Sequence, residues 1–133
     1  MRQDGAMMSP ELTLTTVNIG APDAASLADF YARLLGWTVV VAEPHWVLLR
    51  NPSGGVGLSF QTEEHYVRPV WPSEKDEQGV MMHLEVRVRD LTAAVDHAVA
   101  CGAVVAEFQP QDDVRVCVDP AGHPFCLWLD GQV

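Results

Sequence analysis

Apolar and polar positions follow the same order twice along the chain. Each copy begins with a β-branched run, passes an aspartate into a stretch whose apolar residues recur at helical spacing, and reaches a glycine before the next apolar run. Aligning Thr16 with His83 also aligns Asp23 with Asp90, so the two copies share one register. This self-similarity indicates a tandem duplication, and we call the copies the first and the second module.

The first module is predicted to contain one helix and four strands. Residues 12–20 are β-branched and partly alternating, which predicts the first strand. Asp23 is expected to accept hydrogen bonds from the free N–H groups at the start of the helix, and Gly36 suits a left-handed turn at its end. The strands that follow are predicted at residues 37–42, 45–50 and 56–61.

The second module repeats this order. Residues 80–88 predict a strand, Asp90 is expected to cap the next helix, and Gly102 to end it. The remaining strands are predicted at residues 103–108, 114–119 and 124–129. The pattern is therefore strand, helix and three strands, written βαβββ, in each module.

Length and composition limit how the two modules are organised. The chain has 133 residues, of which 48% are hydrophobic, so it is long enough for one packed domain and too short for two ordinary ones. We predict a disordered lead at residues 1–11 and a single α+β domain at residues 12–131. Within it the modules occupy about residues 12–62 and 80–131, joined by an aperiodic linker at residues 63–79.

Charge and cysteine content limit the kinds of partner and the cellular compartment that we expect for this protein. Eight Lys and Arg against eighteen Asp and Glu give a net charge of −10, which disfavours nucleic acid and anionic membranes as partners. The three cysteines have no paired spacing of the disulfide or zinc type, which favours a reducing environment. We find no apolar run of about 20 residues and no signal peptide, so a cytoplasmic location is expected.

His83 and Glu85 are the clearest candidates for chemistry. Alternation along residues 80–88 directs Met82 and the apolar residues in phase with it toward the helix, and His83 and Glu85 to the opposite face of the sheet. A histidine and a carboxylate placed in this way can ligate a metal ion or form a pair for proton transfer. A hydrogen-bonded surface pair is the commoner role for this spacing.

Several motifs together resemble one known superfamily. They are FYARLLGW at residues 30–37, MHLEVRVRDL at residues 82–91 and DPAGHPFCLW at residues 119–128, and they occur within the duplicated modules. They are similar to the vicinal oxygen chelate superfamily, and within it to its glyoxalase-like and bleomycin-resistance-like proteins. The resemblance implies paired βαβββ modules whose mixed sheets curl around a cleft, commonly in a homodimer.

The resemblance also implies where a metal would bind in the members that use one. The four ligand positions fall on His83, Thr16, Cys126 and Ser59, or on Leu58 in place of Ser59 if the turns are aligned. Only His83 is a usual ligand for a catalytic metal of this kind, and Thr and Ser suit it poorly. No metal cofactor is therefore expected. If a divalent metal does bind, the expected ligands are His83 with Glu85 or Cys126.

The function predicted from this site is binding of a small organic molecule in the cleft, for sequestration and resistance or for metal-independent chemistry with His83 and Glu85 as the proton-transfer pair. The alternative is a metal-dependent lyase, isomerase or dioxygenase of the glyoxalase type. His123 follows a turn glycine and is expected to cap the hairpin. Strand alternation and nearby tryptophans predict the lining of the cleft: Thr16, Asn18, Trp46, Ser59, Gln61, Trp71, His83, Glu85, Cys126 and Trp128.

Overall fold

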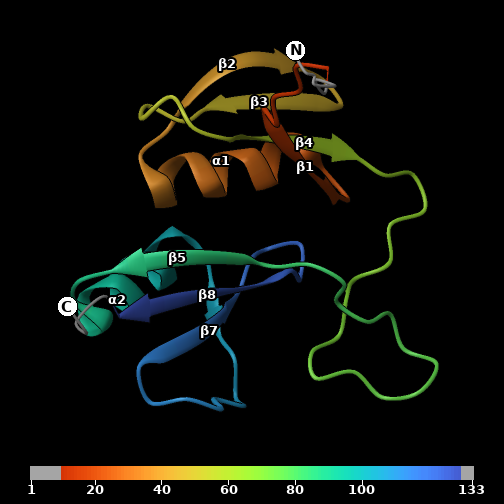
Figure 1. Cartoon of the computed structure of the whole chain (residues 1–133). Coiled ribbons are helices and arrows are strands. Elements are labelled where there is room, and N and C mark those ends of the chain that lie inside the picture. The colour runs from red at the N-terminus through yellow and green to blue at the C-terminus, as the bar shows by residue number, and fades with distance from the viewer. Residues whose placement is uncertain (1–9, 130–133) are drawn as a thin grey trace.

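The computed structural model describes residues 10–129, and Figure 1 shows two similar halves, one above the other. The first module contains β1 (Thr16–Ala21), α1 (Ala24–Leu35), β2 (Thr38–Glu43), β3 (Trp46–Arg50) and β4 (Gly57–Thr62). The second contains β5 (Leu84–Val88), α2 (Leu91–Cys101), β6 (Val104–Val105), β7 (Val114–Val118) and β8 (Pro124–Leu129). The predicted α+β fold of two βαβββ modules is confirmed. The expected lead falls mainly on residues 1–9, outside the described residues.

Each module forms its own four-stranded mixed sheet. The strand orders are β1-β4-β3-β2 and β5-β8-β7-β6, with a parallel pair at β1 and β4 and at β5 and β8, and antiparallel pairs elsewhere. The parallel pairs place Asn18 opposite Ser59 and Glu85 opposite Cys126. The duplication therefore extends from the order of the elements to the register of equivalent residues.

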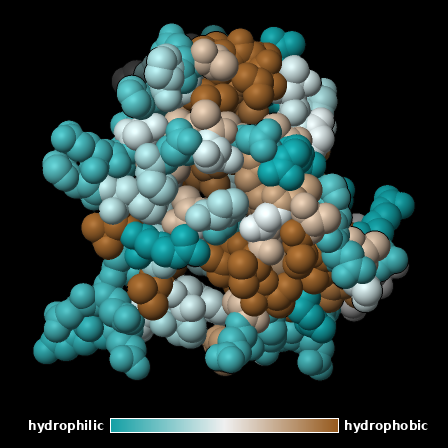
Figure 2. Space-filling view, turned by 180° about the vertical axis from the view of Figure 1, so that it is seen from behind, coloured by the Kyte–Doolittle hydropathy of each residue, from teal (hydrophilic) through white to brown (hydrophobic). Residues whose placement is uncertain are grey.

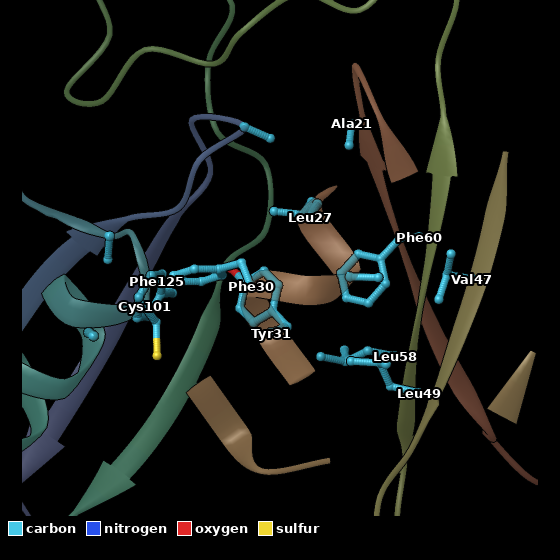
Figure 3. Close-up of a cluster of buried hydrophobic side chains, with 14 of the residues drawn as sticks. Ala21, Leu27, Phe30, Tyr31, Val47, Leu49, Leu58, Phe60, Cys101 and Phe125 are labelled. Atoms are coloured by element: carbon cyan, nitrogen blue, oxygen red, sulfur yellow. The ribbon is translucent and has the colours of Figure 1, made fainter. Parts of the chain in front are cut away.

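The two modules share one hydrophobic core. In Figure 1, α1 lies between the first sheet and strands β5 and β8. Tyr31 on α1 stacks on Phe60 of β4 at 5.6 Å between ring centroids and meets Phe125 of β8 edge-on at 6.0 Å. Figure 3 shows these rings as one cluster, with Phe30 beside Tyr31. Burial of these aromatic side chains drives the association of the modules, because large rings remove the most apolar area from water.

The helix caps differ between the modules. The carboxylate of Asp90 accepts a hydrogen bond from the N–H of Ala93, as predicted. Asp23 makes no such bond; it accepts from the Ser26 hydroxyl, and the N–H of Ala24 donates to Thr62 Oγ1 on β4. The predicted role of Asp23 is therefore wrong, because a residue distant in sequence satisfies the helix N-terminus instead.

Two strands begin later than predicted. β1 begins at Thr16, opposite Gly57, which is the first residue of β4. The N–H of Gly57 donates to the carbonyl oxygen of Thr15, and residues 12–14 lie beyond the start of β4. β5 begins at Leu84, which lies opposite Phe125, the second residue of β8. The first residue of β8 is Pro124, and proline has no N–H to donate to a neighbouring strand. Met82 consequently lies outside the strand and is 77% exposed, so its predicted packing against the helix is wrong.

β6 is shorter than predicted because a side chain replaces part of it. The amide of Gln109 accepts a hydrogen bond from the N–H of Val116 at 2.9 Å and donates to its carbonyl oxygen at 2.9 Å. It also donates to the carbonyl oxygen of Ala106 at 2.7 Å. Gln109 thus binds the N–H of Val116 and the carbonyl oxygen of Ala106, which would bond to each other in a longer β6, while the N–H of Ala106 still donates to the carbonyl oxygen of Val116. The predicted strand at residues 103–108 is reduced to two residues.

The described surface is mixed in character. Figure 2 shows exposed apolar surface in separate areas, one toward the top of the molecule and a broader one in its lower half, with more polar surface between them. Neither helix of the described chain combines the length and the apolar character that a membrane-spanning helix requires.

Candidate functional site

Three side chains of the second module meet on one face of its sheet. His83 Nε2 and Glu85 Oε2 are 2.5 Å apart, and the potential ligand atoms of His83, Glu85 and Cys126 all lie within 4.8 Å of one another. The parallel register of β5 and β8 brings Cys126 beside Glu85. The side chains of His83 and Glu85 are 44% and 50% exposed, so the cluster is open to solvent and to a ligand.

Burial and a neighbouring carboxylate raise the pKa of the thiol in this cluster. Partial burial raises the pKa of Cys126 to about 11, and the negative charge of Glu85 and a hydrogen bond to Glu85 contribute to that rise. The thiol is therefore protonated near neutral pH and donates to Glu85. Glu85 thus lies between an imidazole and a thiol, both of which contact it.

The cluster fits a metal ion of intermediate softness. Imidazole nitrogen, carboxylate oxygen and thiolate sulfur are all ligands of zinc, and three protein ligands leave a position for a water or a substrate, as in catalytic zinc sites. His83, Glu85 and Cys126 are the residues that would hold the ion. The Thr16 and Ser59 positions add no imidazole, thiol or carboxylate to them.

The first module carries a different polar pair at the equivalent positions. Asn18 Nδ2 donates to Ser59 Oγ at 2.7 Å, and Asn18 and Ser59 align with Glu85 and Cys126 when the modules are superimposed by the repeat. Ser59 is only 2% exposed, so its hydroxyl faces Asn18 rather than solvent. Leu58, the other residue considered for this ligand position, is buried in the core.

A cavity of about 360 Å³ lies where the two modules meet, and we call it the junction cavity. Ile19, Leu84 and Pro124 belong to its apolar lining, and Asn18 and His83 supply polar groups. Its volume is within the range of small-molecule sites, and a mostly apolar lining with a few polar groups is typical of them. Two predicted binding residues from different modules therefore line the same cavity.

The other predicted lining residues lie elsewhere on the fold. Thr16 is at the start of β1, Gln61 pairs with Trp46 across β3 and β4, and Trp128 is a half-buried residue of β8. Trp71, in the segment between the modules, packs against Phe108 with ring centroids 5.5 Å apart. In the described part of the chain, none of these five residues lines the junction cavity, and neither do Ser59, Glu85 and Cys126.

His123 was not predicted to line a site, yet it does. Its Nε2 lies 2.7 Å from the carbonyl oxygen of Gly20 and 3.1 Å from the hydroxyl of Tyr66, and its side chain borders the junction cavity. Its backbone N–H donates to Asp119 Oδ1, which is the hairpin role expected from the turn sequence. No pattern in the sequence indicated the contact with Gly20, because it joins two modules that are distant in sequence.

The comparison with sequence families gives the identity of the fold. The profile of the family described as "Glyoxalase-like domain" matches residues 16–128, which include all ten helices and strands except the last residue of β8. The chain belongs to the glyoxalase-like domain family. The predicted membership of the vicinal oxygen chelate superfamily is thereby confirmed.

Curated relatives of this glyoxalase-like protein come from streptomycetes. The chain is 28% identical to anthracycline biosynthesis protein DnrV of Streptomyces peucetius and 27% identical to anthracycline biosynthesis protein DauV of Streptomyces sp. (strain C5). Each match covers 86% of this chain and 46% of the relative, so the chain spans about half the length of the curated relatives it matches.

Solved structures agree with the fold. A glyoxalase/bleomycin resistance protein/dioxygenase family enzyme from Burkholderia phytofirmans PsJN superimposes with a TM-score of 0.65 at 19% identity, over 87% of this chain and 97% of that one. A glyoxalase-related enzyme from Fulvimarina pelagi gives a TM-score of 0.64 at 19% identity, over 90% and 89% of the two chains. At these identities the agreement concerns the fold alone.

Proposed function

We propose that this glyoxalase-like protein binds a small organic molecule in the junction cavity. The observation that carries the proposal is that Asn18 of the first module and His83 of the second line one cavity of about 360 Å³. Asn18 offers an amide, and His83 an imidazole in contact with the carboxylate of Glu85. The apolar lining would hold the body of a ligand, and these groups would orient its polar substituents.

The pair of His83 and Glu85 is compatible with two functions of the protein toward the bound molecule. Glu85 contacts the imidazole of His83 and can hold it in one orientation, which is an arrangement suited to proton transfer to or from a ligand. Alternatively, the protein holds the ligand without changing it, as in sequestration and resistance. The names of the two anthracycline biosynthesis relatives favour a polycyclic aromatic ligand, which suits a cavity with a mostly apolar lining.

We further propose a cytoplasmic homodimer. The cluster of His83, Glu85 and Cys126 lies on an open sheet face, which a second copy of the chain can cover. The protein's three free cysteines suit a reducing compartment. Sedimentation equilibrium would test the oligomeric state, and a concentration-independent monomer mass would contradict the dimer.

Ligand binding is tested by titrating the protein with a dihydroxyanthraquinone while its tryptophan fluorescence is recorded. Saturable binding by the wild-type protein should be lost in the double variant Asn18→Ala and His83→Ala. His45→Ala is the matched control, because His45 is an exposed histidine that does not line the cavity. Equal binding by the double variant and the wild-type protein would contradict the proposed site.

A metal-dependent lyase, isomerase or dioxygenase is the second candidate. The specific observation in its favour is the convergence of His83, Glu85 and Cys126 within 4.8 Å. Titration of the protein with Co²⁺ should produce a thiolate-to-metal charge-transfer band in the near ultraviolet. The band should disappear in Cys126→Ser and persist in Cys101→Ala, whose cysteine is buried on α2. A spectrum without this band at saturating Co²⁺ would exclude thiolate ligation and leave the organic-ligand function.

A further inference from the structure

The segment between the modules borders a second cavity, of about 390 Å³, that is open to solvent. The aperiodic sequence of this segment predicts only a linker, but Glu63, Tyr66 and Gln78 from it form part of the cavity wall. Met82 and His123 line both this cavity and the junction cavity. The two cavities therefore adjoin, and we call the second one the linker cavity.

Backbone and side-chain contacts hold Glu63 near the boundary of the two cavities. Its N–H donates to the carbonyl oxygen of Ala21 at 2.8 Å, at the end of β1. A Cβ atom added to Gly20 would lie 3.0 Å from Glu63 Cγ, so the side chain of Glu63 packs directly over that glycine. Gln61 Nε2 donates to Glu63 Oε2 at 3.0 Å and helps to orient the carboxylate. Because Gly20 lines the junction cavity, Glu63 is adjacent to both.

The lining of the linker cavity favours a cation. Glu63 is its one acidic residue, and neither lysine nor arginine is among the described residues that form its wall. Its other side chains include the imidazoles of His65 and His123, the ring of Tyr66 and the thioethers of Met81 and Met82. Aromatic rings and polarizable sulfur are favourable neighbours for an organic cation, and neutral imidazoles do not repel one. The net charge of −10 adds a long-range attraction for positively charged ligands.

We propose that one elongated ligand spans both cavities, with an apolar ring system in the junction cavity and a basic amine beside Glu63 in the linker cavity. This inference rests on the proposed binding of an organic molecule in the junction cavity, and it defines the class of that molecule as a planar ring system that carries an amine-bearing arm. Met82 is 77% exposed and borders both cavities, so this flexible side chain can adjust to a ligand that occupies both.

Two probes separate the contributions of the two cavities. The first is a neutral dihydroxyanthraquinone, and the second is the same ring system with an aminoalkyl arm. We expect the arm to strengthen binding about tenfold, as a charge-assisted hydrogen bond typically does. Glu63→Gln should remove this gain and leave the affinity for the neutral probe unchanged.

Glu64→Gln is the matched control. Glu64 is the next residue, it is exposed, and it does not line the linker cavity, so its substitution removes the same charge from almost the same place. It should leave the tenfold gain intact. An equal loss of affinity for the amine-bearing probe in both variants would mean that the amine interacts only with the overall negative charge of the protein. That result would overturn the proposal.

The remaining outcomes distinguish this inference from the one on which it rests. If the neutral probe binds and the arm adds no affinity, the linker cavity takes no amine and the further inference fails alone. If neither probe binds, both proposals fail. Gly20→Ala provides a second variant, since the added Cβ would displace Glu63 and should weaken binding of the amine-bearing probe more than that of the neutral one.

Discussion

The hydroxyl of Tyr31 donates a hydrogen bond to Asp119 Oδ2 at 2.7 Å, and both side chains are buried. Tyr31 lies on the helix of the first module and Asp119 in the last hairpin of the second. The contact therefore joins the two modules through their shared core. Asp119 also accepts from the N–H groups of Ala121 and His123, so it links the hairpin to the helix.

Removal of the Tyr31 hydroxyl should destabilise the protein. Tyr31→Phe keeps the stacked ring and leaves a buried carboxylate with one partner fewer, which should lower the free energy of unfolding by about 1–3 kcal/mol. Urea denaturation measures this change. Arg33→Ala, which removes an exposed ion pair with Asp29, should change it by less than about 1 kcal/mol. A Tyr31→Phe protein as stable as the wild type would show that the buried bond contributes nothing.

Asp119 should make stability depend on pH. Burial raises the pKa of Asp119, although the hydrogen bond from Tyr31 and the nearby His123 oppose the rise. The folded protein thus binds this proton more tightly than the unfolded chain does. The stabilising contribution is present below the unfolded pKa of about 3.9 and is lost as the pH rises through the higher folded pKa.

The comparison with Asp119→Asn isolates that contribution. Asparagine retains an oxygen for the two hairpin N–H groups but does not ionise in this range. The stability of the wild-type protein relative to the variant should therefore fall as the pH rises above about 4. Chemical denaturation at a series of pH values tests this, and a relative stability that rises over that range would contradict the assigned direction.

Cys126 should react slowly with alkylating agents at neutral pH. Its pKa is raised to about 11, first by burial and then by Glu85, and the thiolate is the reactive form. The rate of iodoacetamide modification in the presence of a chelator, mapped to Cys126 by mass spectrometry, should still be rising above pH 9. Glu85→Gln should shift the profile to lower pH, whereas Glu64→Gln should not. A wild-type midpoint near the ordinary thiol value of about 8.5 would contradict the effect of the cluster.

The two modules should unfold together. Phe125 of β8 is fully buried and contacts Phe30 and Tyr31 of the first module, so neither module has a complete core alone. Tryptophan fluorescence and far-ultraviolet circular dichroism should give one coincident urea transition. Phe125→Ala should lower the free energy of unfolding by about 3–5 kcal/mol, while a transition that splits in two in the wild-type protein would show independent modules.

Local features of the chain predicted most of the elements and part of the candidate site. Gly36 adopts the predicted left-handed conformation, with φ at 72°, and Gly102 ends the second helix as predicted, with φ at 123°. The contact between His83 and Glu85 also follows from their spacing near one strand. The errors arose where side-chain hydrogen bonds replaced the expected ones. At Asp23 the distant Thr62 binds the helix N-terminus, and at β6 the nearby Gln109 takes the place of a strand hydrogen bond.

The sequence by itself determined the two βαβββ modules, their family and the pairing of His83 with Glu85. These features depend on periodicity, turn residues and short spacings, which involve residues close together in the chain. Only the tertiary structure decided how one module packs on the other. That packing brings His123 to the carbonyl oxygen of Gly20, 103 residues away in sequence, and forms the junction and linker cavities. Such contacts depend on the complementary shapes of two folded surfaces, and no local pattern encodes them.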